Sequence, residues 1–539
     1  MSSSSTSLSP SNSAMQQVLL MPELLEQIFE NLRTGGINIP YDQLLSVALT
    51  CRTFNRPALA SLWSNLPTFE PVVRVLSQDC WEEISTPSPR GWKDVHVQLR
   101  PKRRITKDDC DRLSFYRKQV RHITLDSGEM KFAAVDPDFF EQLGRIFGAT
   151  SIFPGLQHVR WWCQDTKVVP LWVIKHLTAP TLEGVCFKTF MDTESAHSIQ
   201  QVVNGSTCPG IKELKIILHD NHPTGESLPD LDFLPLLKSF DNLQHVELAQ
   251  LSTESYLYLM TKSGPGTLSL SFSCFSEMDW DAIHGTRGFS HLRTLHLTAG
   301  CYRTMDVETL SRLFGTLKAP LLDLEIENIE GPITGDDWGR LFAQISDGTT
   351  GELLERLVLS ESVFVYQESS LEEKSGITGL NVAPLLRFSR LSELSLTTHL
   401  CYNLEDEDIR LMAKSFPNLA GLHLQTYSRR TGLLSLTTNC LVYLVALCPR
   451  LTRISLYIRP TLSNLVEALG MEKLSGLSCL NSNSSSLLSN TDLEAILDTL
   501  FPDVTSESRS GGYFCRSRWS GVRKDLAGGD AVIKFELIR

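Results

Sequence analysis

The sequence predicts an α/β fold in which short parallel strands alternate with helices in a repeat array, preceded by a small three-helix bundle. Two observations carry this prediction. A spacing of three apolar residues, written L-x-x-L-x-L, recurs ten times between residues 156 and 456. Residues 20–66 instead hold three short segments with helical periodicity. At 539 residues the chain is too long for one ordinary compact domain, and a repeat array accounts for such a length.

The composition is typical of a soluble intracellular protein. Hydrophobic residues make up 42% and charged residues 21% of the chain. The net charge is −12, and since residues 1–150 carry 17 basic and 17 acidic side chains, the acidic excess lies in 151–539. This balance argues against nucleic acid or an anionic membrane as the main partner. The thirteen cysteines are scattered without a CxxC, and no signal peptide or membrane-spanning run is present, so we expect reduced thiols and a cytoplasmic and/or nuclear location.

A helical bundle is predicted over residues 18–66, after a Ser-rich tail at 1–17. The stretch MPELLEQIFENL carries its apolar residues at helical spacing, and Pro22 suits a first helical turn. Two more helices are expected within QLLSVALTCRTFN and PALASLWSNL. The apolar content is high for a bundle of this size, so either a partner protein or the rest of the chain must cover it. The residues alone favour neither interpretation.

The order of residues in this bundle resembles the F-box motif. That motif runs from a leucine- or methionine-proline start, through an apolar helix with an Ile-Phe pair, to V/A-x-x-V-C-[RK]-x-[WF] and a terminal tryptophan. The chain departs in Met21, in Phe54 and in a long first loop, roughly 34–43. The resemblance implies that the bundle binds a Skp-family adaptor and, through it, a cullin. The residues it carries over, some of which must form the bundle core, are Pro22, Leu24, Leu25, Ile28, Phe29, Leu32, Leu45, Val47, Cys51, Phe54 and Trp63.

Residues 67–150 are expected to form a linker or capping region. They contain a basic cluster at 102–107, which could touch nucleic acid or act as a nuclear signal. The acidic residues that follow, Asp108, Asp109 and Asp111, favour a solvated helix start instead. A helix and then a strand are expected after this cluster, the strand on Val120, Ile123 and Leu125.

Residues 151–505 are predicted to form an irregular leucine-rich-repeat solenoid. In each copy the last two apolar positions alternate with polar ones, as a short strand requires, and a proline before several copies ends the previous helix. A degenerate copy is expected near Leu268-Ser269-Leu270, and helices within 307–317, 406–416, 437–447 and 491–501. Residues 506–539 would form a C-terminal cap or tail. The copies, about 33 residues apart on average, begin at Leu156, Leu182, Ile211, Leu243, Leu292, Leu321, Leu354, Leu391, Leu419 and Leu451.

Catalytic and metal-binding constellations are not found in the sequence. The run 219–222, HDNH, has no cysteine or carboxylate set to complete a metal site and is predicted to be a polar loop. The run 263–267, SGPGT, lacks the lysine of a phosphate-binding loop and is predicted to be a turn. We therefore expect no enzymatic activity, no metal and no cofactor.

The combination of the bundle and the repeats resembles the F-box/leucine-rich-repeat subunits of SCF-type ubiquitin ligases, of the type expanded in fungi. The resemblance implies a chain that holds a protein substrate near a ubiquitin-loaded enzyme. The alternative is a repeat scaffold with no ubiquitin role, in which the N-terminal helices only cap the array. The substrate would lie on the strand-lined face, where a candidate contact can equally be a plain solvated position. The candidate contacts are His158, Arg160, Lys215, Glu247, His296, Glu325 and His423.

Overall fold

The structure is a computed structural model, and the chain folds as two compact units, Met1–Glu247 and Leu248–Arg539. We call them the N-terminal and the C-terminal unit. The residues that the structure describes are 21–34, 41–87, 95–126, 133–148, 151–163, 170–189, 199, 208–218, 232–248, 250–262, 268–272, 278–283, 286, 288–298, 305–330, 333–350, 352–362, 376–426, 435–437, 439–458, 523–525 and 532–538.

The N-terminal unit is built on a sheet in the order β1-β4-β6-β7-β8-β9. The first five strands pair in parallel, as expected for repeats that each contribute one strand. The strands are β1 (Asn65–Leu66), β4 (His122–Asp126), β6 (His158–Cys163), β7 (Gly184–Thr189), β8 (Glu213–Leu218) and β9 (His245–Leu248).

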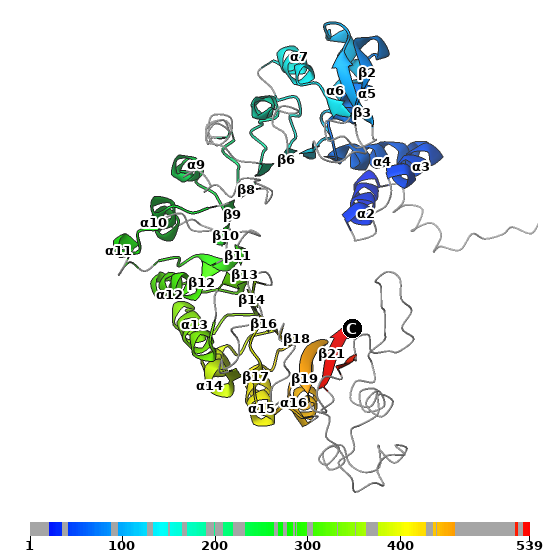
Figure 1. The fold of residues 1–539 in the computed structure, drawn as a ribbon. Helices are drawn as coiled ribbons and strands as arrows, with labels where there is room; N and C mark the ends of the chain where they lie inside the picture. Colours follow the sequence, from blue (N-terminus) through cyan, green and yellow to red (C-terminus); the bar gives the residue numbers. More distant parts are fainter. Residues whose placement is uncertain are drawn as a thin grey trace, which may run out of the picture. The chain divides into compact units, whose positions relative to one another are not determined.

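The helices of the N-terminal unit begin with three that precede this sheet, followed by shorter ones between strands (Figure 1). The first three are α2 (Pro22–Thr34), α3 (Tyr41–Thr50) and α4 (Arg52–Ser64). The others are α5 (Glu70–Arg74), α6 (Asp111–Tyr116), α7 (Asp138–Phe147) and α9 (Leu234–Lys238), with 3-10 turns η1 (Gln78–Cys80), η2 (Asp108–Cys110) and η3 (Leu171–His176).

The stretch 67–150, expected to be a linker or capping region, contributes strands to two sheets. Its strand β4 belongs to the parallel sheet of the unit and is the expected strand on Ile123 and Leu125. A separate three-stranded sheet has the order β2-β3-β5. Its members are β2 (Trp81–Pro87), β3 (Val95–Pro101) and β5 (Ala134–Val135).

The C-terminal unit repeats the same plan with a sheet in the order β10-β11-β13-β14-β16-β18-β19-β21-β20. All pairs from β10 to β19 are parallel, whereas β21 pairs antiparallel with β19. The strands are β10 (Leu268–Phe272), β11 (Leu292–Thr298), β13 (Asp323–Glu330), β14 (Arg356–Glu361), β16 (Glu393–Thr398), β18 (Gly421–Thr426), β19 (Arg453–Ile458), β20 (Arg523–Asp525) and β21 (Val532–Ile538). Three two-residue strands complete the unit: β12 (Met305–Asp306), β15 (Ile377–Thr378) and β17 (Tyr402–Asn403).

The helices of the C-terminal unit alternate with its strands (Figure 1), and several begin at polar side chains that cap them. Asp306 accepts a hydrogen bond from the Thr309 N–H at the start of α12, and Thr334 and Asp337 form a capping box at α13. None of the described helices is long and apolar enough to cross a bilayer. The helices are α10 (Thr253–Thr261), α11 (Trp280–Ile283), α12 (Val307–Thr316), α13 (Gly335–Gly348), α14 (Gly379–Val382), η5 (Ala383–Arg387), α15 (Asp406–Ser415) and α16 (Asn439–Leu447).

The core of each unit is made by the apolar residues of the repeated spacing. All thirty residues of the ten copies are buried, from Leu156 to Leu456, and the residue between the last two apolar positions of each copy is half-buried in most copies. The degenerate copy expected near Leu268 is confirmed as β10. The helices expected at 307–317, 406–416 and 437–447 are α12, α15 and α16, while the one at 491–501 lies outside the described residues. The predicted fold class, a leucine-rich-repeat solenoid of parallel strands and helices, is confirmed.

Successive repeats are joined at the start of most strands by one shared carbonyl. The Leu322 carbonyl accepts from the N–H groups of both Glu355 and Arg356, at 2.8 and 3.0 Å. The Glu355 carbonyl in turn accepts from the two residues that start the next strand, at 2.7 and 3.1 Å. The same arrangement recurs at the Gln157 carbonyl in the N-terminal unit. Each repeat is therefore held in register before its strand begins to pair.

Replacing a repeat leucine with alanine tests whether the repeat leucines carry the stability. Leu394 in β16 is fully buried, so Leu394→Ala should lower the free energy of unfolding by about 2–5 kcal/mol. The matched control is Leu380→Ala in α14, where the side chain is 87% exposed and the change should stay within about 0.5 kcal/mol. Urea unfolding followed by circular dichroism measures both, and equal costs would contradict the assignment of the core.

Candidate protein-interaction surfaces

The N-terminal helices form a bundle with its own small core. Helices α2 and α3 each pack against α4. Within this core the rings of Phe29 and Phe54 meet edge to face at 6.2 Å, and the Asn55 side chain donates to the Ala48 carbonyl at 2.9 Å. The buried residues of the core are Leu25, Phe29, Leu44, Ala48 and Ala58.

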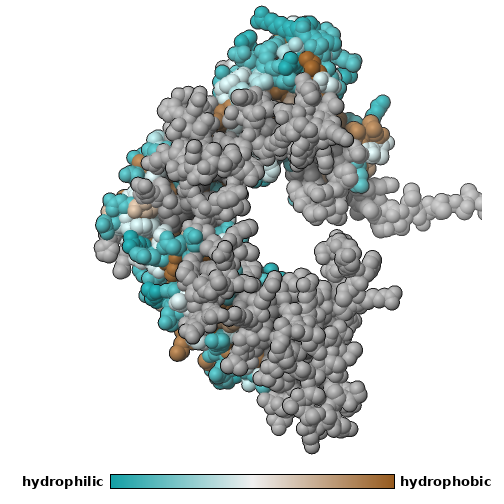
Figure 2. Space-filling view, in the orientation of Figure 1, coloured by the Kyte–Doolittle hydropathy of each residue, from teal (hydrophilic) through white to brown (hydrophobic). Residues whose placement is uncertain are grey.

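The same bundle leaves large apolar side chains exposed. Nine large hydrophobic residues are exposed among the described residues, and four of them lie between residues 21 and 49. These four, which we call the bundle surface, are Met21, Ile28, Leu45 and Leu49. Leu49 is 76% exposed, and Figure 2 shows apolar side chains at the surface where α3 lies. Such a concentration of exposed apolar groups is typical of a contact site for another protein.

The structure separates the predicted adaptor contacts into two groups. Leu25 and Phe29 belong to the core, whereas Ile28, Leu45 and Cys51 are exposed. Leu24, Val47 and Phe54 are half-buried, and the side chains of Pro22 and Leu32 lie outside the described part. Leu49, which is not among the predicted contacts, is also exposed and lies one helical turn after Leu45.

Trp63, another predicted adaptor contact, is engaged within the chain. Its half-buried indole stacks on the Tyr116 ring of α6 with centroids 4.5 Å apart. Helix α4 continues directly into β1, which pairs with β4, and the Arg121 N–H donates to the Ser64 carbonyl at 2.9 Å. The bundle is thus attached to the first strands of the sheet by stacking and by strand pairing.

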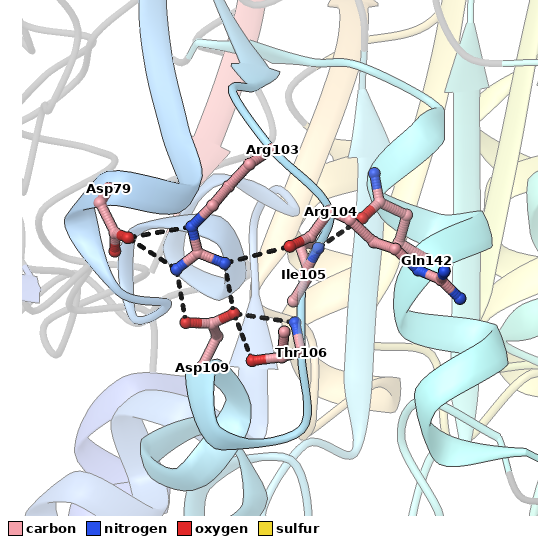
Figure 3. Close-up of polar contacts among 7 residues, drawn as sticks. All are labelled: Asp79, Arg103, Arg104, Ile105, Thr106, Asp109 and Gln142. Carbon is pink, nitrogen blue, oxygen red and sulfur yellow. Dashed lines mark hydrogen bonds and ion pairs between the residues drawn. The ribbon is translucent and has the colours of Figure 1, made fainter.

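One residue of the basic cluster at 102–107, Arg103, is held by carboxylates of its own chain (Figure 3). The Arg103 guanidinium donates to Asp79 at 2.7 Å and to Asp109 at 2.8 Å. The hydrogen bonds from Arg103 hold the pKa of the Asp109 carboxyl far below its usual range. Asp109 also accepts from the Thr106 N–H at 2.8 Å, so the expected helix start is an ion-paired turn and Arg103 is not free to contact nucleic acid.

The same place holds a group of three potential metal ligands. The donor atoms of Asp79, Cys80 and Asp109 lie within 4.8 Å of one another, the one such group among the described residues. Burial and a hydrogen bond to Asp109 raise the pKa of the Cys80 thiol to about 12, so the thiolate that a metal needs is disfavoured. Arg103 already supplies the positive charge between the carboxylates, and we assign no metal here.

The predicted substrate contacts lie on the strand face opposite the core, in aligned rows. In the N-terminal unit Arg160 of β6 is in register with Cys186, which is in register with Lys215 of β8. The Lys215 ammonium lies 3.8 Å from the Glu247 carboxylate. In the C-terminal unit one continuous row joins His296, Glu325, Val358, Ser395 and His423.

Ion pairs on this face reach across strands where a glycine leaves room. Gly184 of β7 lies between His158 and Glu213, whose side chains are 3.7 Å apart, and a Cβ at Gly184 would lie only 2.4 Å from the His158 ring. The C-terminal unit has the same arrangement at Gly421 of β18, which lies between two charged residues on the flanking strands. There the Arg453 guanidinium reaches Glu393 at 3.1 Å.

The strand face of the C-terminal unit is a ladder of alternating charges. The Arg356 guanidinium lies 2.9 Å from Asp323, 2.8 Å from Glu325 and 3.5 Å from Glu393. His296 contacts Asp323 at 3.2 Å, and this hydrogen bond raises the pKa of His296. The pKa of Glu327 is raised by burial and by the neighbouring Glu325 carboxylate. Arg356 and Arg453 on this face are therefore both paired with carboxylates.

A buried carboxylate that the sequence did not indicate lies at the end of β14. Glu361 is 2% exposed and accepts hydrogen bonds from the Trp338 indole at 3.0 Å and the Thr398 hydroxyl at 2.8 Å. The His399 N–H donates to it at 2.6 Å. Burial raises the pKa of Glu361 despite these donors. Since all its partners belong to α13 and to the end of β16, it has a structural role.

Comparisons with known proteins add distant likenesses in fold. No protein-family model matches the chain, and no curated protein matches its sequence. Similar solved structures include the yeast complex of Rad7 and Elc1, with 13% identity, a TM-score of 0.34 and coverage of 83% of this chain and 93% of that one. Another is the leucine-rich-repeat-containing protein LegL7 from Legionella pneumophila, with 10% identity, a TM-score of 0.30 and coverage of 65% and 99%. The assignment as a leucine-rich-repeat solenoid rests on the chain's own strand pairing.

The charge ladder predicts a pH dependence of stability at His296. Because Asp323 raises its folded pKa above the ordinary value of 6.5, protonated His296 adds stability that is fully present below about pH 6.5 and is lost as the pH rises through the folded pKa. His296→Gln should therefore cost more at pH 6 than at pH 8.5, by less than about 1 kcal/mol since the ring is partly exposed. Urea unfolding at both pH values measures this, with the exposed His291→Gln as control. A cost that does not fall with rising pH contradicts the pairing.

Proposed function

We propose that this chain is the substrate-recruiting subunit of an SCF-type ubiquitin ligase and docks onto a Skp-family adaptor through its N-terminal bundle. The observation that carries the proposal is the bundle surface, Met21, Ile28, Leu45 and Leu49, exposed beside a complete small core. The order of residues in the bundle resembles the F-box motif, which supplies the kind of partner. The adaptor would in turn bind a cullin, and the chain would act in the cytoplasm or nucleus.

The bundle surface is large enough to contribute substantially to the free energy of binding a partner. Full burial of one leucine, isoleucine or methionine side chain contributes roughly 1.5–3 kcal/mol. Four such side chains can therefore offset the several kcal/mol that association costs in lost freedom of motion. The exposed residues lie on α2 and α3, whereas α4 packs beneath them and continues into the sheet. A partner held by α2 and α3 would therefore be linked to the repeats through α4.

The repeats would hold the protein to be modified. Their strand faces carry charged rows without a catalytic constellation among the described residues, which fits binding rather than chemistry. A bound substrate would gain a high effective concentration near the ubiquitin-loaded enzyme, so that recruitment alone speeds the transfer. The catalytic groups would come from other subunits.

A repeat scaffold with no ubiquitin role is the second candidate. The stacking of Trp63 on Tyr116 and the pairing of β1 with β4 favour it, because they show that the bundle caps its own sheet. Capping does not account for the exposed leucines of α3, however, since a cap with a free outer face is normally polar there. The two candidates differ in whether an adaptor covers these leucines.

Aspartate residues placed on the bundle surface should distinguish the ligase role from the scaffold role. In the full chain, Leu45→Asp with Leu49→Asp should weaken binding to a purified Skp-family adaptor by more than about a hundredfold, since two buried leucines contribute about 3 kcal/mol or more. Both positions are exposed, so circular dichroism and the urea midpoint should stay unchanged. Biolayer interferometry measures the affinity.

The matched control places the same charge on exposed leucines of the repeats. Leu380→Asp with Leu411→Asp should leave adaptor binding unchanged. If the wild-type chain does not bind the adaptor, or if the Leu45 and Leu49 variant binds as well as the wild type, the ligase role is wrong and the scaffold remains.

A further inference from the structure

The strand face of the N-terminal unit carries a cluster of cations that the proposed docking does not use. Arg160 and Trp162 lie on β6, and Lys188 lies beside them on β7. Trp162 is in register with Lys188, and Arg160 with Cys186. All three side chains belong to the face opposite the buried Val159, Trp161 and Phe187. We call Arg160, Trp162 and Lys188 the strand-face cluster.

Neither cation of the cluster has an ion pair with a carboxylate whose side chain the structure describes. On the same face Lys215 lies 2.9 Å from Glu213 and 3.8 Å from Glu247, so that its charge is already compensated. Arg160 is exposed, and no ion pair joins it to a residue with a described side chain; the side chain of Asp126, in register with Trp162 on β4, lies outside that part. The Lys188 ammonium lies over the Trp162 ring at 5.6 Å from the centroid, which leaves its charge available to an anion.

The indole of the cluster is held in place yet accessible. Trp162 is 38% exposed, one of the few large apolar side chains at the surface of the described chain. Its ring is covered on one side by the Lys188 ammonium of the neighbouring strand. A fixed, exposed ring between two free cations can pack against an apolar side chain of a ligand while the cations bind its acid groups.

The spacing suits an extended acidic peptide. Diagonal neighbours such as Arg160 and Lys188 lie about 7–8 Å apart on adjacent strands. In an extended peptide every second side chain points to the same face, so an apolar side chain and the acid groups two residues before and after it can face the cluster together. A long polyanion such as single-stranded nucleic acid would have to continue past Glu213 and Glu247, whose negative charges would repel it. In the C-terminal unit Arg356 and Arg453 are paired with carboxylates, so an anion would have to displace these partners.

We propose that the strand-face cluster binds an acidic, extended segment of the protein that this chain recruits, with an apolar residue of that segment packed on Trp162. This inference rests on the proposed recruiting function and adds the chemistry of the recruited segment. The acid groups that Arg160 and Lys188 bind can be carboxylates or phosphates. The shared requirement is a negative charge on each side of an apolar side chain.

The test uses the full chain and fluorescein-labelled peptides in fluorescence anisotropy. The probes are a peptide in which glutamates flank one phenylalanine, the same peptide with lysines, the same with phosphoserines, and a thymidine oligonucleotide. The glutamate peptide should bind and the lysine peptide should not. Binding should weaken with added salt, because exposed charges are screened. Tighter binding of the phosphoserine peptide would identify phosphate as the source of the charge.

Variants assign the binding to the cluster. Arg160→Glu with Lys188→Glu should weaken binding of the glutamate peptide by at least about tenfold. The milder Arg160→Gln with Lys188→Gln should also weaken binding of the glutamate peptide. Trp162→Ala should weaken binding of this peptide more than it weakens binding of a peptide with alanine in place of phenylalanine. Each variant is checked for folding by circular dichroism.

The chain offers a matched control for these variants on η3. There the Lys175 ammonium lies over the Trp172 ring at 5.0 Å, the same kind of pair at a position outside the strand face. Lys175→Glu with Trp172→Ala should leave peptide binding unchanged. The proposal would be overturned if the wild-type chain and both Arg160 and Lys188 double variants bound the glutamate peptide equally well. It would also be overturned if the chain bound the oligonucleotide in preference to the peptides and these variants abolished that binding.

Different results would contradict the proposed adaptor docking and the proposed peptide binding. All cluster variants should retain adaptor binding, since the bundle surface is untouched. A chain that binds the adaptor but not the acidic peptides would overturn this inference and leave the proposed function intact. A chain that binds the peptides through the cluster but not the adaptor would overturn the ligase role alone.

Discussion

The structure depends on a backbone carbonyl that accepts two hydrogen bonds at the start of most strands. In the C-terminal unit the carbonyls of Leu322, Glu355 and Ser392 each accept hydrogen bonds from two consecutive N–H groups of the following repeat. This arrangement fixes each new turn of chain one strand spacing from the last, so that the parallel strands start in register. The apolar residues of the L-x-x-L-x-L spacing then fall on one face and make a continuous core. Each repeat contacts its neighbours, and none could bury that face alone.

Because the register is fixed, side chains on the opposite strand face line up in rows across the strands. Each repeat contributes one residue to a row, so the sequence of successive repeats determines the charge of that row. In the C-terminal unit the row of Asp323, Arg356 and Glu393 holds paired charges. In the N-terminal unit Arg160 and Lys188, which lie in neighbouring rows, have no ion pair with a described side chain. The bundle joins the N-terminal unit through β1, the first strand of its sheet, so a partner on α3 would be tied to these rows.

The sequence predicted the strands well because their signal is local. Each apolar triplet specifies its own strand, and even the degenerate copy at Leu268 forms β10. The triplet Val120, Ile123 and Leu125 has the same spacing, and its last two residues lie in β4, in the stretch predicted to be a linker or capping region. The contacts across strands could not be predicted, since Arg356 meets carboxylates 31 to 37 residues away through loops of unequal length. For the same reason helical periodicity could not tell the buried Leu25 from the exposed Ile28, because both lie on one stripe of α2 and only the position of α4 decides which is covered.

Hydrogen–deuterium exchange of the full chain, alone and with a purified Skp-family adaptor, tests the central claim most directly. The claim is that α2 and α3 present a docking face while the repeats remain free for another protein. The account predicts slower exchange of amides in 21–34 and 41–50 when the adaptor is added, with strands β11, β13 and β14 unchanged. Unchanged exchange in both helices, or protection confined to the strands, would contradict it.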